Sequence, residues 1–120
     1  MAILPILEAP HPVLSARARD VQDSELGAEL EELISSMAET MYAAPGVGLA
    51  APQVGDGRRI LVANLKGDVD EHSTEEFIVM INPVIVERST QMIRWEESCL
   101  SVPEFDLDVD RHQRVHIQWT

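Results

Sequence analysis

Two short segments of this 120-residue sequence carry residues that could do chemistry. The first is Glu97-Ser98-Cys99-Leu100-Ser101, which holds the single cysteine of the chain. A thiolate can act as a nucleophile or as a metal ligand, whereas a lone cysteine among apolar residues is also typical of a small core residue. Spacing alone leaves both interpretations open. Because one cysteine cannot form an internal disulfide, its presence fits a reducing compartment.

The second segment is Gly46-Val47-Gly48-Leu49-Ala50-Ala51-Pro52-Gln53. It is not a dinucleotide-binding fingerprint, because Ala51 stands where G-x-G-x-x-G requires glycine and because the predicted helix precedes the segment. No Walker lysine follows it either. The small residues indicate a tight turn and close packing. Alternatively, the exposed main-chain groups and the amide of Gln53 serve as hydrogen-bonding groups.

A third pattern, His112-Gln113-Arg114-Val115-His116, has two histidines four residues apart. We do not expect a metal site here, because the pattern indicates a loop that runs into a strand, where residues four apart lie ~13 Å from each other. Only a helix would place both imidazoles on one face, and Gln113 cannot act as a general base. Surface histidines are the better interpretation.

The elements that must position these segments are one helix and several strands. Between Ser24 and Met41, apolar residues recur at three- and four-residue steps, which predicts an amphipathic helix capped by Asp23 or Ser24 and ended by Pro45-Gly46. Strands are predicted at 59–65, at 77–87 with an edge or bulge at Pro83, and at 115–119. Residues 1–23 are expected to form an extended arm, and 99–105 an irregular segment.

Charge and hydropathy exclude several classes of function. Nine Lys and Arg against 21 Asp and Glu give a net charge of −12, which repels the phosphates of nucleic acids and anionic lipids. No apolar run approaches the ~18 residues that cross a bilayer, and the N-terminus lacks the cationic start of a signal peptide. We therefore expect a cytoplasmic protein with no direct nucleic-acid or membrane partner; the sequence does not predict the oligomeric state.

In this order, the two segments resemble the first two of the three signature motifs of the peptide deformylases. Residues 46–53 match the first motif at every defining position, and 97–101 match the second except that Ser98 stands where the family has glycine. The Pro-His-Pro-Val-Leu segment at 10–14, the helix and the Ile-Asn-Pro-Val-Ile segment at 81–85 are also similar. The resemblance covers nearly the whole chain.

The resemblance implies one α+β domain over residues 1–120, in which a long N-terminal helix packs on antiparallel strands. It implies metal-dependent hydrolysis of the formyl group from formyl-methionyl nascent polypeptides during protein biosynthesis. In that family a divalent metal, often Fe²⁺ in the cell, with Zn²⁺, Ni²⁺ or Co²⁺ as other candidates, is held by the second-motif cysteine and two histidines of a later HExxH helix. Such a metal lowers the pKa of its bound water.

Carried over residue by residue, the resemblance implies distinct roles for the motif residues. Cys99 would be the metal ligand, while the Gln53 amide and the Leu100 N–H would stabilise the formyl oxygen as the catalytic donors. The substrate would be bound by the Gly48 backbone and by Val47, which lines the methionine pocket, with Glu97 as a supporting motif residue.

The third motif, HExxH, is absent from the sequence, so two metal ligands and the general base are missing. We expect a deformylase-like chain interrupted at Thr120, without its C-terminal HExxH helix and inactive alone. Ser98 would strain the ligand loop if its backbone required a positive φ. Acidic residues near Asp106 stand where the family often carries an arginine, so anionic substrate ends would be repelled.

Two alternatives stay open. The chain could be a non-catalytic relative that keeps the peptide groove as a binding module, with Gln53 and Leu100 as hydrogen-bonding groups. It could also be a defective fragment, which would leave apolar surface exposed on the sheet and on the helix stripe between Leu26 and Met41.

Overall fold

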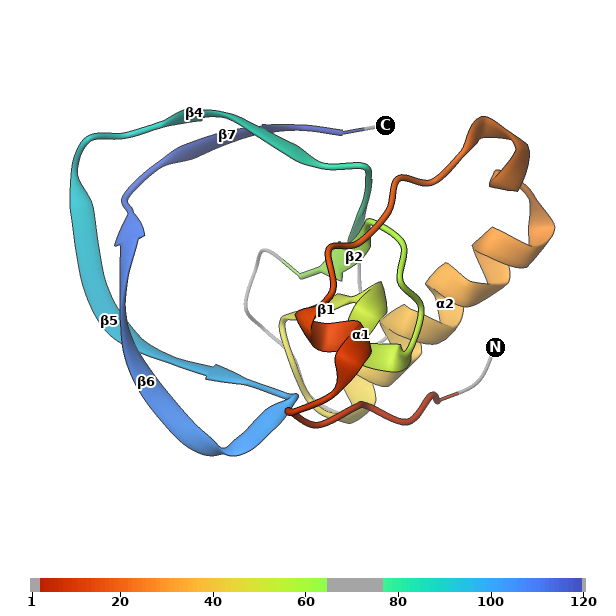
Figure 1. The fold of residues 1–120 in the computed structure, drawn as a ribbon, viewed down its shortest axis with the longest axis horizontal. Helices are drawn as coiled ribbons and strands as arrows, with labels where there is room; N and C mark the ends of the chain where they lie inside the picture. The colour runs from red at the N-terminus through yellow and green to blue at the C-terminus, as the bar shows by residue number, and fades with distance from the viewer. Residues whose placement is uncertain (1–2, 65–76, 120) are drawn as a thin grey trace.

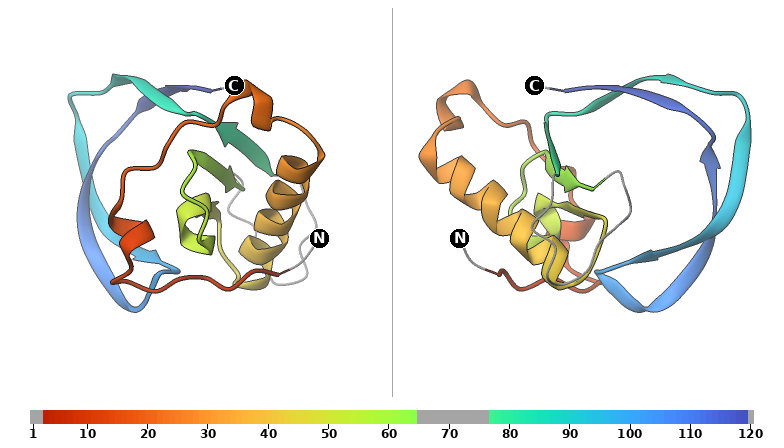
Figure 2. Two further views of the ribbon diagram at one scale, coloured as in Figure 1. Left: turned by 45° about the vertical axis from the view of Figure 1, so that its right-hand side comes forward. Right: turned by 180° about the vertical axis from the view of Figure 1, so that it is seen from behind.

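The computed structural model describes residues 3–64 and 77–119. A body formed by the helices and a three-stranded sheet lies on one side, and two long antiparallel ribbons curve away from it on the other (Figures 1 and 2). This agrees with the predicted α+β class, one main helix with antiparallel strands. No helix in the described part of the chain is long and apolar enough to cross a membrane.

The main helix, α2, spans Ala28–Ala43, and its apolar stripe faces the body. Met37 and Met41 are fully buried and Leu30 nearly so, which confirms the periodic pattern. The predicted start was too early, because residues Asp23–Glu25 form a separate 3-10 turn, η1, and Gly27 is the N-cap without a side-chain hydrogen bond. The caps predicted at Asp23 and Ser24 are therefore wrong.

The three-stranded sheet has the order β1-β2-β3 with both pairs antiparallel. Its strands are β1 at Gly48–Ala50, β2 at Ile60–Ala63 and β3 at Ile78–Ile81, and the 3-10 turn η2 at Ala51–Val54 follows β1. Apolar side chains from α2 and this sheet share one core; its strand residues include Leu49, Ile60 and Val62. Leu65, included in the predicted strand, lies outside the described residues.

The strand predicted at 77–87 is two strands, β3 and β4 (Val84–Arg88). Asn82 separates them with a left-handed backbone, φ 53°, a conformation that asparagine tolerates better than most residues. Its amide is fixed on the arm, since Nδ2 donates to the Val21 carbonyl at 3.0 Å and Oδ1 accepts from the Val21 N–H at 2.8 Å. This kink directs the chain out of the sheet and into the ribbons.

Each ribbon is a pair of antiparallel strands. β4 pairs with β7 (Val115–Gln118), with a bulge between Ile85 and Glu87. β5 (Met92–Cys99) pairs with β6 (Val102–His112). At 8 and 11 residues, they are the longest of the described strands. The segment predicted to be irregular is therefore mostly strand, with a tight turn at residues 100–101.

Much of the ribbon surface is apolar and exposed. Trp95 is 57% exposed and Trp119 48%. Further exposed apolar residues on the ribbons are Val84, Ile85, Val86, Met92, Ile93, Leu107 and Val115. The expected exposure of apolar sheet surface is thus confirmed. The helix stripe is mostly covered: Leu33 and Ile34 are partly buried, and Leu26, which is 47% exposed, lies before α2.

The N-terminal arm is extended, as predicted, apart from the short helix α1 at Pro12–Ser15. It runs beneath the body and reaches the turn between β5 and β6 (Figure 1). Farther along, Arg19 forms a parallel bridge with Arg58, and the arm is thereby attached beside β2.

Candidate functional site

The two motif segments meet at a pocket of about 310 Å³ at the junction of the body and the β5–β6 turn. One wall comes from the loop after α2, from β1 and from η2, and the other from the end of β5 and the turn that follows it. The lining residues are Pro45, Gly46, Val47, Gly48, Gln53, Ser98, Cys99 and Leu100. The predicted residues Val47, Gly48, Gln53, Cys99 and Leu100 are therefore brought together, although the segments lie far apart in sequence.

The side chain of Gln53 is held by its own 3-10 turn. Its Oε1 accepts a hydrogen bond from the Ala50 N–H at 2.9 Å, and this contact directs Nε2 away from η2. Nε2 lies 3.3 Å from Ser101 Oγ and 3.7 Å from Cys99 Sγ. Because the amide oxygen of Gln53 is hydrogen-bonded at the start of η2, the NH₂ group is the end of the side chain that faces the pocket.

Strand β1 presents a free edge beside this amide, because its single neighbour in the described sheet is β2. The Ala50 N–H points away from β2 and donates to Gln53 Oε1. The Val47 carbonyl points the other way and accepts a hydrogen bond from the Asn64 N–H at 2.8 Å. Main-chain groups alternate in direction along a strand. The N–H and C=O of Gly48 therefore point to the free edge, where an extended peptide could pair with them.

The second wall is the turn that ends β5. The register of β5 and β6 shifts between Ser98 and Cys99, so the ladder is irregular where the thiol lies. Cys99 is exposed, and Leu100 packs partly on the core. A Cβ added to Gly46 would lie 3.0 Å from Leu100 Cδ1, so glycine at 46 permits the close approach of the two walls.

The backbone at Ser98 is not strained by a positive φ. Among the described residues, Asn82 is the non-glycine residue with a positive φ, so the backbone of Ser98 lies in a region open to any L-amino acid. The serine in place of the motif glycine is therefore compatible with the turn that presents Cys99.

Glu97 is engaged across the ribbon rather than in the pocket lining. Arg111 donates two hydrogen bonds to its carboxylate, at 2.9 and 2.8 Å, and Trp95 Nε1 donates a third at 2.6 Å. The Arg111 hydrogen bonds, followed by that of Trp95, lower the pKa of Glu97. The carboxylate thus stays ionised and fixes β5 to β6 just before Cys99.

Sequence reasoning assigned no role to Ser101, which is 4% exposed and lies under the Gln53 amide. It also assigned none to the arm residues Leu7 and Ala9, whose N–H groups donate to the carbonyls of Gln53 and Ser101 at 2.7 and 2.8 Å. Ser101 could have been singled out as the last residue of its motif. The arm contacts left no signal in the sequence, because they are made by the main chain.

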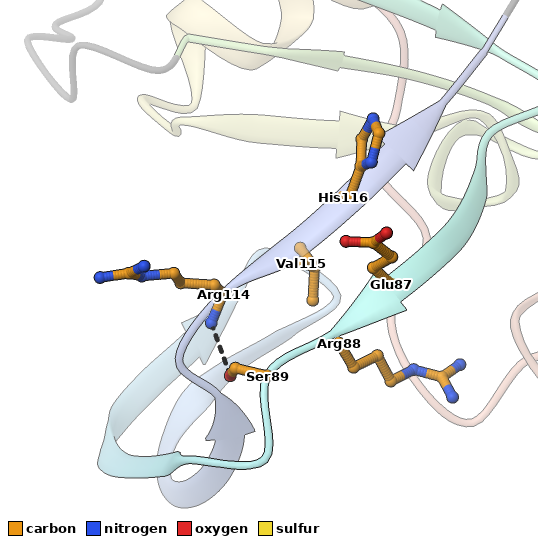
Figure 3. A pocket seen from close by; sticks show the side chains of 6 residues that line it. All are labelled: Glu87, Arg88, Ser89, Arg114, Val115 and His116. Atoms are coloured by element: carbon orange, nitrogen blue, oxygen red, sulfur yellow. Dashed lines mark hydrogen bonds between the residues drawn. The ribbon is translucent and has the colours of Figure 1, made fainter.

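A second hollow, of about 260 Å³, lies where β4 meets β7 (Figure 3). Glu87 and His116 face each other across the strands, while the side chains of Arg88 and Arg114 extend away in opposite directions. The segment from 112 to 116 is a strand end, a turn and a strand, not a helix, and His112 contacts the Ser89 carbonyl instead at 2.8 Å.

Residues 3–64 and 77–119 contain no group of three His, Cys, Asp or Glu side chains close enough to hold a metal ion. The pocket itself supplies one such donor, the thiol of Cys99. The described residues therefore do not make up a complete metal site.

Comparison with known proteins gives one consistent result. Residues 3–120 match the family described as polypeptide deformylase. A peptide deformylase of Syntrophobacter fumaroxidans is 45% identical over 118 residues, which cover 98% of this chain and 66% of that protein. One of Maricaulis maris is 40% identical over 119 residues, covering 99% and 66%. The chain thus spans about two thirds of the length of these curated relatives.

Solved structures show the same similarity in three dimensions. The crystal structure of peptide deformylase from Thermotoga maritima superposes with a TM-score of 0.87 at 34% identity, covering 99% of this chain and 74% of that one. A class I type b peptide deformylase from Acinetobacter baumannii, crystallised with Met-Ala-Ser bound, gives a TM-score of 0.85 at 33% identity, with 98% and 76% covered.

Proposed function

The chain belongs to the polypeptide deformylase family, and on this premise we propose that its pocket binds the formylated N-terminus of a methionyl peptide. Residues 1–120 act as a single domain that holds the substrate for deformylation. The activity concerns newly made polypeptides, and the proposed location is therefore the cytoplasm.

In this proposal the pocket residues divide between the formyl group and the peptide. The Gln53 amide and the Leu100 N–H donate hydrogen bonds to the formyl oxygen, on which negative charge develops during hydrolysis. Gly48 pairs with the peptide main chain through the N–H and C=O at the free edge of β1. Val47, 52% exposed at the pocket rim, contacts the methionine side chain. Glu97 supports the site from outside by its contact with Arg111.

One observation carries the proposal: the Gln53 amide faces the Cys99 turn at 3.7 Å, beside the free edge of β1. An amide donor, a thiol and strand groups that no described strand covers lie together in this pocket, and they suit a short extended peptide with a polar, carbonyl-bearing end. A related deformylase crystallised with Met-Ala-Ser supports the same class of ligand.

The family uses a divalent metal, and we propose Cys99 as one of its ligands here. A single thiol does not make a catalytic metal site, for which three protein ligands are usual. The residues that the structure describes therefore do not make up the complete metal centre. The part we assign to this chain's own residues is to bind and orient the substrate.

The direct test is a titration that compares formyl-Met-Ala-Ser with Met-Ala-Ser on the metal-free chain. We expect saturable binding with a preference for the formylated peptide, because the Gln53 amide can donate to the formyl oxygen but would face a charged ammonium group in the other peptide. Gln53→Ala should remove most of the preference, about fivefold for one hydrogen bond. Gln113→Ala, on the far ribbon end, is the matched control. Absence of saturable binding at millimolar peptide would overturn the proposal.

Turnover is tested separately. The 120-residue chain with added Fe²⁺, Ni²⁺ or Co²⁺ should hydrolyse formyl-Met-Ala-Ser no faster than the metal alone, because two ligands and a general base of the HExxH kind are missing from it. Turnover that disappears in Cys99→Ala would show that these residues suffice for hydrolysis. Binding without turnover favours the alternative of a peptide-binding module for the chain as it stands.

A further inference from the structure

The N-terminal arm touches both halves of the pocket. The Leu7 N–H donates to the Gln53 carbonyl at 2.7 Å, and the Ala9 N–H donates to the Ser101 carbonyl at 2.8 Å. Earlier in the arm, the Leu4 N–H donates to Thr40 Oγ1 at 2.8 Å, on the helix that leads into the first motif. Three residues of the arm between positions 4 and 9 thus donate hydrogen bonds to α2, to η2 and to the β5–β6 turn.

These arm contacts are shorter than the direct contacts between the two halves. The Gln53 amide nitrogen lies 3.3 Å from Ser101 Oγ, slightly beyond the 2.7–3.2 Å that is common for N–H···O bonds, and 3.7 Å from Cys99 Sγ, which is a weak acceptor. Ser101 and Gln53 are 48 residues apart in sequence. These side-chain hydrogen bonds are weak, and the packing of Leu100 on the core is apolar and not directional, so the short main-chain bonds of the arm add the directional contacts across the gap at the pocket.

The arm can fix this gap because its two donors are close together on one chain. The residues that carry the two donors are two positions apart, so their Cα atoms are at most ~7 Å from each other. Leu7 and Ala9 therefore hold the Gln53 and Ser101 carbonyls at a set separation. Since Gln53 is also held through Oε1 by Ala50, its amide keeps one orientation toward Cys99.

We propose that Leu7–Ala9 is a positioning strap, which sets the distance between the Gln53 amide and the Cys99 turn through two main-chain hydrogen bonds. The strap touches no substrate, and it acts through Gln53 and Ser101. Its consequence for formyl recognition rests on the proposed function, whereas its effect on geometry does not.

The geometric test needs no substrate and no variant of the strap. Hydrogen exchange of the wild-type chain should show the Leu7 and Ala9 amides protected relative to the denatured chain, as hydrogen-bonded amides are. Exchange at the denatured rate for both amides would overturn the strap, whatever the peptide titrations show.

The second test measures the Gln53–Cys99 proximity directly. Cys99 is the only thiol, so methylthiolation modifies it alone, and the side-chain NH₂ signals of Gln53 should shift in response. Leu7→Pro removes one donor, and the shift should become smaller in this variant. Leu7→Ala removes the side chain but keeps the N–H, and it should retain the wild-type shift. Ala9→Pro and Ala9→Ser form an equivalent pair at the other donor.

The peptide titration measures the preference for the formylated peptide, which would not change if the strap only stabilised the fold. Leu7→Pro should reduce the preference for formyl-Met-Ala-Ser over Met-Ala-Ser by about fivefold, at a temperature where circular dichroism shows the variant folded. Leu7→Ala should preserve the preference. A full preference in both proline variants would overturn the strap. A wild-type chain with no preference would overturn the proposed function instead, and the exchange and methylthiolation results would still decide on the strap.

Discussion

The Gln53 amide nitrogen lies 3.7 Å from the thiol sulfur of Cys99, although the two residues are 46 positions apart in the chain. One belongs to the sheet body and the other to the end of a ribbon, so the site exists only while the two parts stay joined. Disturbing the junction should therefore affect the site before it affects the core.

Gly46→Ala should alter the pocket with a modest loss of stability. The added Cβ would lie 3.0 Å from Leu100 Cδ1, and the end of that side chain must shift, at a cost of about 1 kcal/mol. Weaker binding of formyl-Met-Ala-Ser should accompany the shift, because both residues line the pocket. Gly57→Ala is the control, since nothing lies within 4 Å of its added Cβ. Denaturant unfolding and peptide titration measure the two effects; equal results for both variants would contradict the junction argument.

Glu25 should stabilise the arm in a pH-dependent way. Hydrogen bonds from Arg19 and then from the Gln22 N–H lower the pKa of Glu25 from 4.5 to about 2. Because the folded pKa is depressed, the contribution is fully present above pH 4.5 and is lost as the pH falls through about 2. Glu25→Gln should thus lower the thermal midpoint at pH 7, and the difference from wild type should shrink below pH 4.5.

The control for this variant is Glu29→Gln, which removes one negative charge from the first turn of α2. Thermal unfolding monitored by circular dichroism between pH 7 and pH 2 follows both. A difference between wild type and Glu25→Gln that stayed constant down to the lowest pH would show that the Arg19 contact contributes nothing.

The β5–β6 ribbon contains a like-charge pair that substitution should relieve. Glu96 lies directly opposite Asp108, and two like charges that face each other across neighbouring strands destabilise the pair. Asp108→Lys should stabilise the chain by ~0.2–1 kcal/mol. The matched control is Asp106→Lys, whose cross-strand partner is Ser98, and it should change stability less. Equal denaturation midpoints for the two variants would refute the cross-strand explanation.

The same acidic face should bias the choice of peptide. Asp106, Asp108 and Asp110 alternate along β6 and share one face, with Asp106 opposite the pocket residue Ser98. Formyl-Met-Lys should therefore bind more tightly than formyl-Met-Asp, by a few-fold at low salt, as exposed charge pairs contribute ~0.2–1 kcal/mol. The preference for the lysine peptide should fall at 1 M salt, where screening is strong. It should also fall in the Asp106→Asn variant, whereas the control variant Asp23→Asn should keep it. An identical affinity for both peptides would exclude this role.

The fold was predictable where apolar periodicity is strong. The stripe of Leu30, Met37 and Met41 predicted α2, although its start was placed too early because η1 continues the polar pattern with its own cap. The β5–β6 ribbon was not predicted, and 99–105 was wrongly expected to be irregular, because the acidic and apolar residues of this ribbon alternate on an exposed strand pair rather than over a core. Exposed strands give a weaker pattern than half-buried ones.

The site was predictable in its residues but not in its geometry. The two motifs named Gln53, Cys99 and Leu100, and the structure brings all three to one pocket. The arm contacts of Leu7 and Ala9 could not be foreseen, because main-chain donors exist at every residue except proline and leave no trace in side-chain patterns.

The exposed ribbons also determine how copies of the chain meet in solution. A net charge of −12 keeps molecules apart at low ionic strength, but the range of this repulsion shrinks from ~10 Å at 0.1 M salt to ~3 Å at 1 M. Apolar side chains such as Trp95 and Trp119 can then touch those of a neighbour. The second virial coefficient of the protein should therefore change from positive, for net repulsion, to negative, for net attraction, as salt is added.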